Sequence, residues 1–236
     1  MKRKIILFAM LLALTGIIAM QSCKKEAPVA FTEHNAFTTP TVVAPEDGAT
    51  LELAAITGEE TLTWASTNAS GDPIKADVYF GTSATPPLYA PNNAALTLNV
   101  PVERGLTYFW RVVMIDANGI KVNSPTFSFT IFDPITIFTG DFNADEPAES
   151  YSYDVTFTAT SHTTLITHNY WNSAWDAVFT LNFADSTYSM PLTVWGGYSG
   201  QESGKINPAT GTMIGDYTIW QGAVAIETGK HTYTKL

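Results

Sequence analysis

The chain has 236 residues, with 12 Lys or Arg against 22 Asp or Glu, and its formal net charge is −10. An acidic chain is repelled by phosphate backbones, which argues against a nucleic-acid partner. The single cysteine excludes an internal disulfide, and the 12% share of aromatic residues, together with abundant Thr, favours β-strands.

Residues 1–25 have the layout of a secretory signal. Three basic residues at positions 2–4 precede an apolar run over 5–20, and the small residue Ser22 precedes Cys23. A basic start, a short apolar middle and a small residue before the cut define such signals. The apolar run, about 16 residues long, is shorter than the roughly 20 residues of a permanent transmembrane helix. We therefore predict that residues 1–22 are removed.

The Ser-Cys-Lys-Lys run over 22–25 resembles the signals of Bacteroidota-type outer-membrane lipoproteins. That resemblance implies that Cys23 becomes the first residue and carries lipid, so that acyl chains attach the protein to the outer membrane. Residues 20–22 depart from the usual Leu-Ala-Gly form, and the alternative is a secreted protein with a cysteine near the cut.

Residues 23–38 show no periodicity and are interpreted as a flexible tether. Surface-exposed lipoproteins of this type often carry an acidic run directly after the cysteine, whereas this chain has Lys24 and Lys25 there. Which face of the outer membrane the protein occupies therefore stays open.

Short alternating runs between turns occupy residues 39–132 and predict a β-sandwich of about seven strands. The residues predicted to face inward are Leu62, Trp64, Ala76, Val78, Phe80, Leu96, Leu98, Val100, Tyr108, Trp110, Val112, Met114, Phe127, Phe129 and Ile131. The run over 106–112 resembles a fibronectin type III-like domain. That resemblance implies that Tyr108 is a corner tyrosine whose hydroxyl bonds to backbone, and that Trp64 is the core tryptophan.

The strand around Tyr108 also carries an outward apolar stripe. If Tyr108 faces inward, the outward residues on and beside its strand are Tyr79, Phe109, Val113 and Ile115. An outward apolar stripe can mark an interface. The interface is either with a partner or, as the simpler interpretation, with the second domain.

Residues 133–236 alternate more cleanly and show no helix longer than a turn. Consecutive hairpins predict an antiparallel up-and-down meander of six to eight strands, either a small barrel or a sandwich, so the whole chain is expected to be all-β. One predicted strand places Tyr188, Met190, Leu192 and Val194 on a single face. The runs over 169–171 and 204–217 resemble the C-terminal domains of Bacteroidota-type surface lipoproteins, which often accompany polysaccharide-uptake machinery.

Strand parity separates the tryptophans of this second domain. Trp175 is in phase with apolar neighbours and is predicted to lie in the core, whereas Trp195 and Trp220 are out of phase and are predicted to face outward. Aromatic faces stack on sugar rings, so these two, with Tyr198 and Asn172, are the predicted ligand-binding residues. The alternative, and the more common role, is that they cap an open barrel end.

The chain lacks the usual motifs of enzymes and metal sites, including Gly-x-Ser-x-Gly, a phosphate-binding loop and His-Glu-x-x-His. Asp141, Asn143 and Asp145 alternate as in a calcium loop. However, Glu146 and Ser152 stand where that loop needs Gly and Glu, so a solvated acidic turn is expected. We predict no cofactor and no metal.

The sequence therefore predicts a cell-envelope lipoprotein that acts as a non-catalytic binding module for polysaccharide or a partner protein. In layout alone it resembles the accessory lipoproteins of starch-utilisation systems, which implies an outer-membrane transporter complex as a partner. One alternative is a structural or adhesin-like envelope subunit. The other is a small hydrolase, because any two carboxylates can meet on an all-β chain.

Overall fold

The structure is a computed structural model that describes residues 38–67 and 74–236. The predicted signal, Cys23 and the tether up to residue 37 lie outside the described residues. Within the described ranges the chain is built of β-strands and contains no α-helix, which confirms the all-β prediction. In that same part of the chain, no helix is long and apolar enough to cross a membrane.

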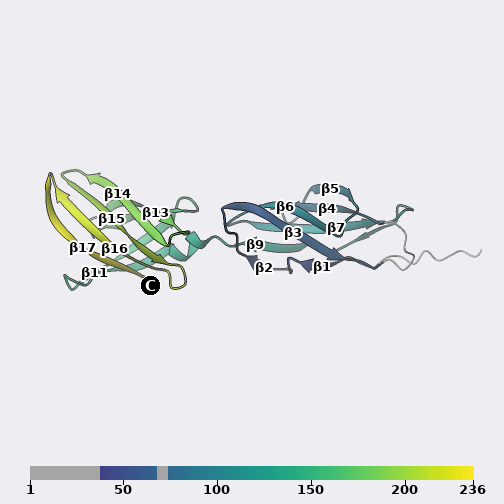
Figure 1. The fold of residues 1–236 in the computed structure, drawn as a ribbon, viewed down its shortest axis with the longest axis horizontal. Helices are drawn as coiled ribbons and strands as arrows, with labels where there is room; N and C mark the ends of the chain where they lie inside the picture. Colours follow the sequence, from purple (N-terminus) through teal and green to yellow (C-terminus); the bar gives the residue numbers. More distant parts are fainter. Residues whose placement is uncertain (1–37, 68–73) are drawn as a thin grey trace, which may run out of the picture. The chain divides into compact units, whose positions relative to one another are not determined.

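Two facing sheets make up the first half of the described chain (Figure 1). One sheet has the order β1-β3-β6, with strands β1 (Thr41–Ala44), β3 (Thr57–Ala65) and β6 (Thr97–Glu103). The other has the order β2-β9-β7-β4-β5, with β8 beside β7, and its strands are β2 (Ala49–Leu51), β4 (Lys75–Gly81), β5 (Leu88–Asn93), β7 (Thr107–Ile115), β8 (Lys121–Asn123) and β9 (Phe127–Ile131). The described residues thus form the expected sandwich, with two three-residue strands, β2 and β8, added.

The sandwich core contains most of the residues that alternation predicts to face inward. Trp64 of β3 and Trp110 of β7 meet between the sheets with ring centroids 6.5 Å apart. The Tyr108 hydroxyl accepts a hydrogen bond from the Glu103 backbone N–H at 2.9 Å, as the corner tyrosine should. Leu96 is the exception, since it is 41% exposed and precedes the first residue of β6.

The predicted apolar stripe on the outer face of β7 is not continuous. Val113 is only 5% exposed, because it lies on a central strand with β8 paired alongside it. Arg111 lies between Phe109 and Val113, and its guanidinium is 3.7 Å from the centroid of the Tyr79 ring. The prediction that Val113 offers an exposed surface is therefore wrong. Tyr79, Phe109 and Ile115 are half-buried, and their interface role stays a prediction.

The second half of the chain is a closed antiparallel barrel in which each strand pairs with the next and β17 returns to pair with β10 (Figure 1). Its strands are β10 (Gly140–Glu146), β11 (Tyr151–Ala159), β12 (Thr164–Tyr170), β13 (Trp175–Asn182), β14 (Thr187–Trp195), β15 (Tyr198–Asn207), β16 (Thr212–Gln221) and β17 (Val224–Lys235). The up-and-down meander is confirmed, and of the two closures left open it takes the barrel.

The 3-10 helix η2 (Pro134–Phe138) closes one end of the barrel. The Asp133 side chain caps it by accepting a hydrogen bond from the Ile135 N–H at 3.2 Å. Ile135 and Phe138 are buried in the barrel core, and the Phe138 ring lies 6.1 Å from that of Phe183, which directly follows β13. The barrel interior is thus filled with side chains at this end, and η2 closes it.

A β-bulge in β14 changes which side chains face inward. Between Met190 and Thr193 this strand has one residue more than β15, so the alternation shifts by one. Leu192 and Val194 are consequently 59% and 68% exposed, although alternation predicts that they face inward. Trp195 packs against the barrel core instead. The prediction that Trp195 faces outward is wrong. Residues that follow a bulge point to the opposite side of the sheet from the one that simple alternation predicts.

Gly204 lies opposite Gly215 in the β15–β16 pair, where the backbones leave no room for a side chain. A Cβ at Gly204 would lie 2.1 Å from the carbonyl oxygen of Ile214. Because backbone atoms cannot rotate away, we expect Gly204→Ala to lower the free energy of unfolding by about 2–3 kcal/mol in urea denaturation. Gly197→Ala is the matched control, since its Cβ would meet nothing within 4 Å. Equal stability of the two variants would contradict the close approach.

Candidate functional site

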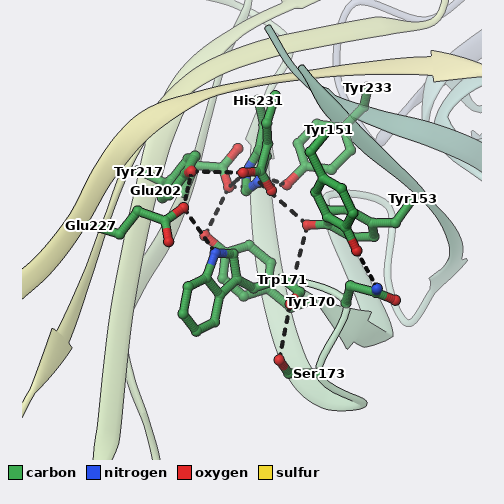
Figure 2. Close-up of polar contacts among 12 residues, drawn as sticks. Tyr151, Tyr153, Tyr170, Trp171, Ser173, Glu202, Tyr217, Glu227, His231 and Tyr233 are labelled. Atoms are coloured by element: carbon green, nitrogen blue, oxygen red, sulfur yellow. Dashed lines mark hydrogen bonds and ion pairs between the residues drawn. The ribbon is translucent and has the colours of Figure 1, made fainter. Parts of the chain in front are cut away.

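The barrel interior away from η2 is polar and centres on three charged side chains, Glu146 of β10, Glu202 of β15 and His231 of β17. Their exposed fractions are 4%, 2% and 0%. Figure 2 labels Glu202 and His231 among the tyrosines that surround them. The Nδ1 atom of His231 lies 2.8 Å from Glu202 Oε2, and its Nε2 atom lies 3.1 Å from Glu146 Oε1. We refer to Glu146, His231 and Glu202 as the buried triad.

Tyrosine hydroxyls complete the hydrogen bonding of the buried triad. Glu202 accepts hydrogen bonds from Tyr170 and Tyr233, each at 3.0 Å, and from Tyr188. With His231, four groups surround this carboxylate, three of them at Oε2. Burial, followed by the nearby glutamates, raises the pKa values of five tyrosines and keeps their hydroxyls neutral; these are Tyr153, Tyr170, Tyr188, Tyr217 and Tyr233.

The charges of the buried triad follow from these contacts. Burial alone would lower the pKa of His231, but its hydrogen bonds to Glu146 and Glu202 raise that pKa to about 9. Burial alone would raise the pKa of Glu146, but hydrogen bonds from His231 and Tyr217 outweigh it and lower that pKa. At neutral pH one imidazolium therefore lies between two carboxylates, and the triad keeps an excess negative charge.

A cleft of about 430 Å³ opens beside the triad at the end of the barrel opposite η2. We call it the mouth cleft, and its lining residues are Glu146, Glu149, Tyr151, Trp171, Ser173 and Glu227. Glu227 accepts hydrogen bonds from the Tyr217 hydroxyl at 2.5 Å and from the Trp171 indole N–H at 3.1 Å (Figure 2). The Tyr217 hydroxyl oxygen also lies 2.9 Å from Glu146 Oε2, so its single proton is shared between the two carboxyl groups and links the cleft directly to the triad.

Stacked aromatic rings form one side of this open end. Trp171 stacks on Trp175 with centroids 5.4 Å apart, and Trp175 stacks on Trp195 at 4.8 Å with an interplanar angle of 8°. Trp195 in turn lies 5.5 Å from Tyr170, and Tyr198 packs against Trp175 at 5.4 Å. We call these five residues the aromatic stack, and it reaches the mouth cleft at Trp171.

The loop between β12 and β13 holds Trp171 in an uncommon backbone conformation. Trp171, Asn172 and Ala174 have φ values of 52°, 46° and 55°, a region that residues other than Gly rarely occupy. Hydrogen bonds support it, because Trp171 N–H donates to the Tyr153 hydroxyl at 3.0 Å and the Asn172 amide donates to the Tyr151 hydroxyl. Non-glycine residues in this region often cluster at binding sites.

The structure brings three of the four predicted ligand-binding residues to this open end. Trp195 and Tyr198 belong to the aromatic stack, and Asn172 lies on the loop beside it. Trp220 lies on the opposite face of the barrel wall, because it pairs with Ser199 while Trp195 pairs with Tyr198. Trp195 and Trp220 therefore do not form one platform. The part of each in binding stays a prediction.

Sequence reasoning missed Glu146 and the rest of the buried triad. The segment expected to be a solvated acidic turn is strand β10, and Glu146 is buried at its end. Alternate residues of β10 face the barrel interior, and these are Phe142, Ala144 and Glu146. This alternation is the signal that could have identified the inward carboxylate. In the described part of the chain, no group of three or more His, Cys, Asp or Glu residues is placed to hold a metal ion.

Comparison with protein-family models and with curated proteins gives no match. Among solved structures, the chain is similar to the sialic acid binding region of a Streptococcus sanguinis adhesin bound to 3'sLn. The identity is 11% and the TM-score is 0.25, over 82% of this chain and 76% of that one. A TM-score this low establishes no shared fold, so the ligand of that adhesin says nothing about the ligand of this chain.

The buried triad makes stability depend on pH. Because the pKa of His231 is raised from 6.5 to about 9, its contribution is fully present below pH 6.5 and is lost as the pH rises through 9. We expect the free energy of unfolding to fall by on the order of 3 kcal/mol over that range. The His231→Gln variant should be less stable at neutral pH and should lack this alkaline decline. An NMR titration with the His231 imidazole titrating below 6.5 would contradict the assignment.

Proposed function

We propose that this protein is a non-catalytic binding module that holds a glycan at the open end of its barrel. The aromatic stack, which ends at Trp171 in the mouth cleft, is the observation that carries this proposal. Aromatic faces pack against the C–H groups of sugar rings, and carboxylates such as Glu227 accept hydrogen bonds from sugar hydroxyls. A concave site with aromatic walls and a few oriented polar groups is typical of small-ligand binding.

Binding is favoured over hydrolysis by the lowered pKa of Glu146 and by the position of Tyr217. Glu146 and Glu227 both bond to the Tyr217 hydroxyl, so they lie close enough to resemble a glycosidase pair. Such a pair needs one carboxyl group that is protonated and can act as the acid. The lowered pKa of Glu146 works against that role, and Tyr217 occupies the space between the two groups.

Lipid attachment through Cys23 is the second part of the proposal. It is supported by the basic, apolar and small-residue segments of the first 22 residues and by their resemblance to Bacteroidota-type lipoprotein signals. Acyl chains on Cys23 would anchor the protein to the outer membrane, with a transporter complex as a partner.

Glycan binding is tested by an array of polysaccharides, followed by calorimetry with the ligand found. We expect Trp171→Ala to weaken binding by roughly tenfold or more, because stacking of one sugar ring is lost. Trp220→Ala is the matched control, a tryptophan on the outer wall of the same barrel. Loss of affinity in Trp220→Ala alone would place the ligand on the outer wall instead, and affinity unchanged in both variants would contradict stacking.

Lipid attachment is tested by labelling cells with radioactive palmitate. We expect label in the protein and none in Cys23→Ser, which should also leave the membrane fraction. Ser22→Ala keeps a small residue before the cysteine and should remain labelled and membrane-bound. A Cys23→Ser protein that still sediments with membranes would contradict the anchor.

A further inference from the structure

We propose that the mouth cleft selects glycans that carry a free, protonated amine. This inference rests on the proposed glycan-binding function and names the class of ligand for the same site. It follows from the charge of the cleft, the surroundings of that charge and the aromatic side chains beside it.

The mouth cleft carries negative charge that the described residues do not neutralise. Glu146, Glu149 and Glu227 line it, and no Lys or Arg of the described chain forms an ion pair with any of them. His231 is the cation in contact with Glu146, and it divides its single charge between that residue and Glu202. Three carboxylates thus line the cleft, and one imidazolium lies behind them, so a positive ligand group would meet a net attraction.

The surroundings strengthen that attraction. Glu146 is 4% exposed, and Glu227 is held in place by donors from Trp171 and Tyr217. Those donors are neutral, so they orient the Glu227 carboxylate without cancelling its charge. Coulomb attraction to a partly buried carboxylate is several times stronger than to one in bulk water.

The aromatic lining favours an organic cation. The Trp171 and Tyr151 side chains line the same cleft as the three carboxylates. The negative faces of such rings attract ammonium groups, most strongly where water is excluded. A volume of about 430 Å³ suits a sugar ring with its ammonium group. A sialylated glycan, which carries a carboxylate, would be repelled by the same charges.

The test compares two oligosaccharides of equal length, a glucosamine oligomer and its N-acetylated counterpart, which differ in the charge of the amine. Calorimetry with the mature full-length protein is done below the pKa of the ligand's amine, with sialyllactosamine as the anionic probe. We expect the glucosamine oligomer to bind at least tenfold tighter than the N-acetylated one. This advantage should shrink as salt is added and as the pH rises past the pKa of the amine.

Local charge is separated from the overall acidity of the chain by matched variants. Glu227→Gln should remove most of the tenfold preference for the amine. Glu59→Gln on β3 changes the net charge equally at an exposed carboxylate and should leave the preference intact. Glu149→Gln is the second variant and should also lower the preference, since Glu149 lines the cleft and, unlike Glu227, is not the acceptor of the Trp171 indole N–H.

The possible results distinguish the preference for an amine from glycan binding itself. Equal affinity for both oligomers, lost in both cases in Trp171→Ala, would overturn the amine preference and leave glycan binding standing. No binding of any glycan would overturn both. A preference that Glu227→Gln and Glu59→Gln reduce equally would show attraction to the whole acidic chain, and it would overturn the inference that the cleft selects the amine.

Discussion

The bridge from Glu146 through His231 to Glu202 is the interaction on which the barrel interior depends. Two buried carboxylates would repel each other and stay poorly solvated without the imidazolium between them. Their remaining acceptor sites orient the tyrosine hydroxyls, and one of those, Tyr217, reaches Glu227 at the surface. Hydrogen bonds inside the barrel therefore fix the position of Glu227, a carboxylate that lines the mouth cleft.

The two ends of the barrel interior differ in composition. Around η2 the barrel is filled by apolar side chains such as Phe138, whose burial stabilises the fold and closes that end. Towards the other end it holds charge, hydroxyls and stacked indoles. The apolar packing around η2 holds the strands in place, and the other end of the barrel can therefore keep an unusual backbone at Trp171 and a charge excess.

Alternation was sufficient to predict the all-β class, the sandwich core and the up-and-down meander, since burial on one face of a strand imposes a period of two. It could not decide between barrel and open sandwich, because closure requires β10 to pair with β17 at the far end of the domain. Alternation predicts the wrong face for Trp195, because a bulge breaks the period of two in that strand. The buried triad was missed because its members come from three strands that are distant in the sequence, and only the folded barrel brings them together.

The extra residue in β14 behaves as an insertion that the strand has absorbed. A homologous chain lacking position 192 would pair regularly here and would still direct Thr193 and Trp195 to their present sides. Related sequences can therefore differ in length at this point while they conserve the aromatic lining. An alignment that forces them to equal length would hide that correspondence by matching residues from opposite sides of the wall.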